Sequence, residues 1–123
     1  MNIRQIDGIN RSIRQNRNDP FYDAKAPNWR GCFVGSLKEW KNFQAENRKV
    51  TEWCTKHDLI LKNGENWDWV PEGKEAPRGA RYTRMIVPRR IDYEYFICDV
   101  LVASAYYCTE IEWYGEPEKF EFF

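Results

Sequence analysis

The chain has 123 residues, with 19 Lys and Arg against 19 Asp and Glu, 6 Trp, 7 Tyr, 7 Phe, four Cys and one His. This length supports one hydrophobic core, so we expect a single domain spanning 1–123. The aromatic content excludes a disordered chain, and a mean hydropathy of -0.79 without a long apolar run excludes a membrane-spanning helix. The first residues lack the apolar stretch of a signal peptide, which predicts a cytoplasmic protein.

The neutral total hides a separation of charge along the chain. Residues 1–90 carry 18 of the basic residues and 11 of the acidic ones, a net of +7, whereas residues 91–123 carry one Lys and eight acids, a net of -7. One interpretation is that the acidic segment folds against the basic one. The other is that a basic surface binds an anion while an acidic surface binds a basic partner.

The N-terminal segment 1–19 is predicted to contain a basic helix. Four isoleucines of residues 2–17 cluster on one side at helical spacing: Ile3, Ile6, Ile9 and Ile13. Pro20 should end this helix, because proline disfavours the helical conformation of the residue before it. Residues 20–35 then resemble a loop with a short strand at 32–34, and we expect residues 36–123 to form the helix-plus-sheet core.

Ser36 and Glu39 have the spacing of a capping box, in which each side chain satisfies the other residue's backbone amide. The pattern predicts a helix from Ser36 to about Lys56. Its buried side would hold Leu37, Trp40, Phe43, Val50 and Cys54. His57 would follow the helix C-terminus, where the helix dipole favours a protonated imidazole.

The remainder of the chain is predicted to be mostly strands. Residues 59–62 and 67–70 flank an Asn-Gly turn and predict a hairpin with Trp67 and Trp69 on one face, and residues 82–87 predict a further strand. Segment 91–114 fits either a buried helix followed by a strand or two strands, and its β-branched and aromatic residues favour strands. The expected fold class is α+β, with the N-terminal helix and one central helix packed on an antiparallel sheet of about four to six strands.

The sequence offers little for catalysis. The four cysteines show no C-x-x-C spacing, and the pair Cys54 and His57 lacks both a second pair of metal ligands and an orienting group for a nucleophile. The carboxylate pairs Asp92 with Glu94 and Glu110 with Glu112 fit solvated strand edges equally well. We therefore expect no catalytic residue, no metal and no cofactor, and a protein that is not an enzyme.

An arginine-rich segment is the candidate anion site. Arginine binds phosphate through two parallel hydrogen bonds and stacks on aromatic rings, and aromatic side chains can stack on bases. The predicted ligand-binding residues are Arg78, Arg81, Tyr82, Arg84, Trp67, Trp69, Trp29 and Arg30.

The chain ends in an apolar tail that contains Phe120, Phe122 and Phe123. Three exposed phenylalanines at a chain end would be unfavourable in water, so the tail should dock on the domain or on another chain. A homo-oligomer is therefore expected, formed through this Phe120–Phe123 tail or through the helix face of Ile3, Ile6 and Ile13.

Two functional hypotheses follow. The first is a small non-enzymatic binding protein that recognises or sequesters a nucleotide or nucleic acid, or blocks a protein that handles one, in the style of phage or mobile-element accessory and counter-defence proteins. The alternative is a protein-protein inhibitor or immunity protein whose acidic C-terminal surface, with Glu110, Glu112 and Glu116, binds a basic partner.

Overall fold

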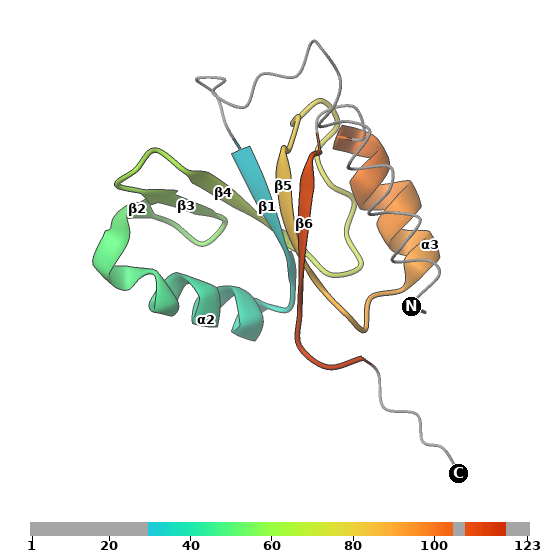
Figure 1. Ribbon diagram of the computed structural model, residues 1–123, viewed down its shortest axis with the longest axis horizontal. Helices are drawn as coiled ribbons and strands as arrows, with labels where there is room; N and C mark the ends of the chain where they lie inside the picture. The colour runs from blue at the N-terminus through green and yellow to red at the C-terminus, as the bar shows by residue number, and fades with distance from the viewer. Residues whose placement is uncertain (1–29, 105–107, 118–123) are drawn as a thin grey trace.

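The computed structural model of the protein describes residues 30–104 and 108–117 (Figure 1). The expected N-terminal helix, Trp29 and the Phe120–Phe123 tail lie outside the described residues. The described chain has mixed α/β content, with two helices and one six-stranded mixed sheet in the order β2-β3-β4-β1-β5-β6.

The sheet is parallel over most of its width, so the expectation of an antiparallel sheet is wrong. Its four parallel strands are β1 (Arg30–Gly35), β4 (Asn66–Pro71), β5 (Arg84–Pro88) and β6 (Glu110–Tyr114). Antiparallel pairing is confined to β2 (Thr51–Cys54), β3 (Asp58–Leu61) and the β3–β4 hairpin. Parallel neighbours need long crossover connections, and here helical segments follow both β1 and β5.

Helix α2 (Leu37–Glu46) begins at the predicted capping box. The Glu39 amide donates to the Ser36 hydroxyl at 3.2 Å, and the Ser36 amide donates to Glu39 Oε1 at 2.9 Å. The helix ends ten residues earlier than expected, because the Asn47 side-chain amide bonds the Phe43 carbonyl and the chain turns through η1 (Arg48–Val50) into β2. Val50 and Cys54, which were expected on the buried side of the helix, lie beyond its end and are exposed. Leu37, also expected to be buried, is exposed at the first position of α2.

The segment between β5 and β6 is helical from residue 93 to residue 104, so the preference for strands there is wrong. It consists of α3 (Tyr93–Tyr95), a π-helical part η2 (Phe96–Leu101) and a 3-10 turn η3 (Val102–Ser104). Asp92 caps it by accepting a hydrogen bond from the Tyr95 amide at 2.8 Å. Helical spacing wins over β propensity because it buries Phe96 and Val100 together and carries the chain across to parallel β6.

The sheet has two differently built faces, and among the described residues the segment from α3 to η3 lies on one face and α2 lies on the other (Figure 1). The first, which we call the closed face, packs against α3 and η2 and is largely aliphatic; its fully buried members include Val34, Val87, Phe96 and Val100. The second, the aromatic face, packs against α2 and includes Phe33, Trp40, Trp67 and Ile86. Among residues 30–104 and 108–117, no helix has the length and apolar character needed to cross a membrane.

Candidate binding groove on the aromatic face

The residues of the predicted anion site lie in different environments. Arg78 has an 89% exposed side chain and pairs with Glu75 at 3.5 Å, and Arg81 is exposed in the loop before β5 with a positive φ of 56°. Tyr82 is fully buried in the closed face, where its hydroxyl donates to Asp68 Oδ2 at 2.9 Å. Burial, followed by the charge of Asp68, raises the pKa of the Tyr82 phenol. Strand β5 begins at Arg84 rather than at residue 82 as predicted. Tyr82 packs on the closed face, whereas Arg84 lies over Trp67 on the aromatic face.

The two other predicted arginines pair with acids of the same chain. Arg30 Nη2 lies 2.6 Å from Asp68 Oδ2, so the structure joins Arg30 and Tyr82 at one carboxylate. Arg84 lies 3.4 Å from Glu65 and 3.3 Å from Glu110. Through the parallel β5–β6 pairing, Glu110 of the acidic C-terminal segment thus pairs with Arg84 of the basic segment.

The tryptophans proposed as stacking planes for bases contact other side chains of the chain. Trp67 is 2% exposed, and the Arg84 guanidinium lies over its ring at 5.3 Å from the centroid. Trp69 lies on the same face, as predicted, and stacks with Trp40 and with His57. His57 lies between β2 and β3, so its expected place at a helix C-terminus is wrong.

A groove of about 330 Å³ opens on the aromatic face between α2 and the strands β5 and β6. It forms because Trp40 and Phe43 of α2 pack with residues of β1, β3 and β4, which leaves the space toward β6 uncovered. The residues that line the groove are Phe33, Glu39, Asn42, Phe43, Glu46, Ile86, Glu112 and Tyr114.

The floor of the groove is aromatic and fixed in place. Phe33 stacks with Phe43 at 4.9 Å and with Tyr114 at 5.2 Å between ring centroids. The Tyr114 hydroxyl donates to the Val34 carbonyl at 2.7 Å, which anchors the ring to β1. Burial raises the pKa of the Tyr114 phenol, so its hydroxyl remains a neutral donor at physiological pH. The ring faces supply partial negative charge without a titratable group.

One of the three acids of the groove is neutralised by the chain itself. Arg90 donates to both carboxylate oxygens of Glu39 at 2.8 Å and also bonds Glu72 at 2.6 Å. The hydrogen bonds from Arg90 lower the pKa of Glu39 to about 2. Because this guanidinium is held by two carboxylates, it does not offset the other acids of the groove.

The other two acids, Glu46 and Glu112, are exposed. Within residues 30–104 and 108–117, neither of them forms an ion pair with a Lys or Arg. The groove therefore combines an aromatic floor with two uncompensated carboxylates, an arrangement that attracts a cation.

Sequence reasoning found only part of this groove. Of the three predicted partner-binding acids, Glu112 lines the groove. Glu110, two residues away on β6, pairs with Arg84, and Glu116 is exposed beyond the end of β6. Phe33, Phe43 and Tyr114 were missed as a set, because they come from three separate elements. A usable signal was the seven-residue spacing of Glu39 and Glu46, which places both on one side of a helix.

Of the four cysteines, two are buried and two are exposed. Cys32 and Cys108 are buried thiols, and burial raises the pKa of Cys32 well above its usual value. Cys54 lies at the end of β2 rather than on the predicted helix that begins at Ser36. No group of three or more His, Cys, Asp or Glu that could hold a metal occurs among the described residues.

Comparison with protein-family models finds no match for this chain, and comparison with curated proteins and with solved structures finds no significant similarity to either.

Proposed function

We propose that this protein is a non-enzymatic binding protein that captures a basic partner protein, with a Lys or Arg side chain of the partner seated in the groove. The observation that carries the proposal is that Glu46 and Glu112 line the same aromatic-floored cavity and have no cationic partner in the described part of the chain. The function is that of an inhibitor or immunity protein, which acts by covering a basic surface of its target.

The chemistry of the groove favours a protein cation over a small anion. A cation over an aromatic face gains about 0.5–2 kcal/mol depending on its desolvation. Two nearby carboxylates add electrostatic attraction and steer the encounter, which accelerates association at low salt. Phe33, Phe43 and Tyr114 provide the aromatic surface on which the aliphatic stem of a Lys side chain can pack.

The ion pairs of the predicted anion site support the same preference. A phosphate would have to compete with Asp68 for Arg30, and with Glu65 and Glu110 for Arg84. The planes of Trp67 and Trp69 are already covered by Arg84, Trp40 and His57. Arg78 and Arg81 are exposed, and Arg78 pairs with Glu75. Exposed charges give weak binding.

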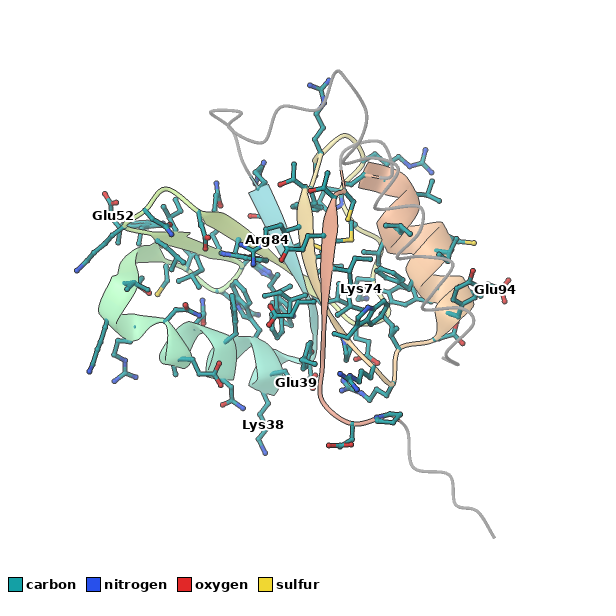
Figure 2. The ribbon with its side chains drawn as sticks, viewed as in Figure 1. Lys38, Glu39, Glu52, Lys74, Arg84 and Glu94 are labelled. Carbon is teal, nitrogen blue, oxygen red and sulfur yellow. The ribbon has the colours of Figure 1, made fainter. Side chains whose placement is uncertain are left out.

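The test compares two fluorescent probes of opposite charge, a short oligolysine peptide and a short single-stranded oligothymidylate, by fluorescence anisotropy at low salt. Oligolysine should bind, and the double variant Glu46→Lys/Glu112→Lys should weaken it by about tenfold or more. The matched control is Glu52→Lys/Glu94→Lys, which changes the net charge equally at exposed acids on β2 and α3, away from the groove (Figure 2).

Two results would contradict the proposal. Equal loss of oligolysine binding in both double variants would assign the attraction to net charge alone. Binding of oligothymidylate that is lost in Arg78→Ala/Arg81→Ala would instead support the anion-binding hypothesis.

A further inference from the structure

Strand β6 ends the sheet on the side of the groove. In the described chain it pairs with β5, and no described strand pairs with its other edge. A strand at the edge of a sheet presents backbone N–H and C=O groups that can pair with another extended chain. Edges of this kind are a recurring docking site for peptides, which bind as an additional strand.

The side chains of β6 make this edge continuous with the groove. Ile111 and Trp113 pack against the closed face. Because successive side chains of a strand alternate between faces, Glu110, Glu112 and Tyr114 lie on the aromatic face, where Glu112 and Tyr114 line the groove. A chain paired with β6 would therefore place every second side chain beside this acidic and aromatic row.

We propose that the partner binds as an extended segment that adds to the outer edge of β6, with Lys or Arg at alternate positions directed toward the groove. This inference rests on the proposed function and names the form in which the basic partner is recognised. Charge complementarity selects the occupant: Glu112 and Glu46 have no cationic partner in the described chain, and Glu110, although paired with Arg84, keeps a 45% exposed side chain.

The spacing of the acids selects an extended segment over a helix. Glu110 and Glu112 are two residues apart on one strand face, roughly 7 Å along the strand, and the same-face side chains of a paired strand repeat at the same interval. A helix would present basic side chains three or four residues apart and would leave the backbone edge of β6 unpaired. The alternating basic pattern is therefore the feature that specifies the register of the partner.

The test uses a peptide of alternating Lys and Thr and two analogues that carry backbone N-methyl groups on one or the other set of alternate residues. All three have the same charge, but each analogue lacks the N–H donors along one edge. The unmodified peptide should bind and slow amide hydrogen exchange within Glu110–Tyr114, while Thr51–Cys54 of the other edge strand stays unchanged. One analogue should bind about tenfold more weakly, and the other should bind like the parent.

The possible failures are distinguishable. If all three peptides bind equally and the amides of β6 are not protected, strand addition is overturned while capture of the basic side chains stands. If protection appears at Thr51–Cys54 instead, the partner uses the β2 edge and this inference is wrong. If no peptide binds, both the strand addition and the proposed function fail.

Discussion

The two faces of the sheet are formed by the same strands, yet one holds a largely aliphatic core and the other carries the groove. On the closed face, aliphatic side chains such as Val34 and Val87 are fully buried beneath α3 and η2. On the aromatic face, large rings pack against α2, but the space beside β6 remains a groove lined by carboxylates. The difference shows how alternation along a strand lets β6 contribute Trp113 to a core and Glu112 to a candidate binding surface.

The largest expected effect lies on the closed face. Phe96 is fully buried and packs edge-on against Trp113 at 5.9 Å between centroids. Phe96→Ala should lower the free energy of unfolding by about 4 kcal/mol because it leaves a cavity. Urea denaturation measures the loss, and the matched change Asn42→Ala on the groove should cost less than about 0.5 kcal/mol. A similar loss of unfolding free energy in both variants would show that the closed face is not the more tightly packed of the two.

A smaller loss of stability is expected for a substitution at Gly31, where β1 pairs with β4 on the aromatic face. A Cβ atom at Gly31 would lie 2.5 Å from Cζ3 of the Trp67 ring, so Gly31→Ala must displace the indole. We expect a destabilisation of about 2 kcal/mol, measured by thermal unfolding. Because the strain depends on the large ring, a double-mutant cycle with Trp67→Leu should be non-additive. Additive effects would show that the strain arises elsewhere.

The Glu39–Arg90 ion pair, beside the groove, should make a pH-dependent contribution to the free energy of unfolding. Glu39→Gln keeps a side-chain acceptor for the Ser36 amide but removes the charge held by Arg90, and it should cost roughly 1.5 kcal/mol at neutral pH. The pKa of Glu39 is lowered to about 2 in the folded state. Its stabilisation is therefore present above the ordinary carboxyl pKa of about 4.3 and is lost as the pH falls toward 2.

Urea unfolding of the wild type and of Glu39→Gln between neutral and acidic pH checks the direction of this pH dependence. The difference between wild type and Glu39→Gln should shrink steadily below about pH 4. A difference that stays constant to pH 2 would contradict the role of the ionised pair.

A stability change smaller than that of Glu39→Gln is expected at the groove floor. Tyr114→Phe removes the hydrogen bond to the Val34 carbonyl but keeps the ring stacked on Phe33, so it should cost about 1 kcal/mol. Oligolysine affinity should change little, because the aromatic surface remains. In contrast, Tyr114→Ala should weaken oligolysine binding as well as stability. Equal affinity of the two variants, measured by anisotropy, would show that the ring does not contribute to the groove.

Local signals in the sequence predicted local structure. The Ser36–Glu39 capping box, the hairpin between β3 and β4, and the common face of Trp67 and Trp69 were all confirmed, because each depends on residues close together in the chain. The parallel strand order was not predictable in the same way, since it depends on crossovers through helical segments. Residues 93–104 combine strand-forming residue types with helical spacing, and only tertiary packing decides between the two.

The candidate groove was harder to predict for the same reason. The Tyr114 hydroxyl reaches the carbonyl of Val34 across 80 residues of sequence, and Phe43 joins them from a helix. The acidic composition of β6 drew attention to Glu112, which lines the groove, but composition cannot reveal which acids are neutralised within the chain. That distinction required the positions of Arg84 and Arg90.

The most direct test of the central claim is a chemical-shift map of the protein titrated with oligolysine. We predict that the largest backbone amide shifts occur in α2 and β6, at residues of the groove such as Asn42, Phe43 and Glu112. Shifts that leave the groove unchanged and cluster instead around exposed acids elsewhere, such as Glu52 or Glu94, would contradict the assignment of the groove as the binding site.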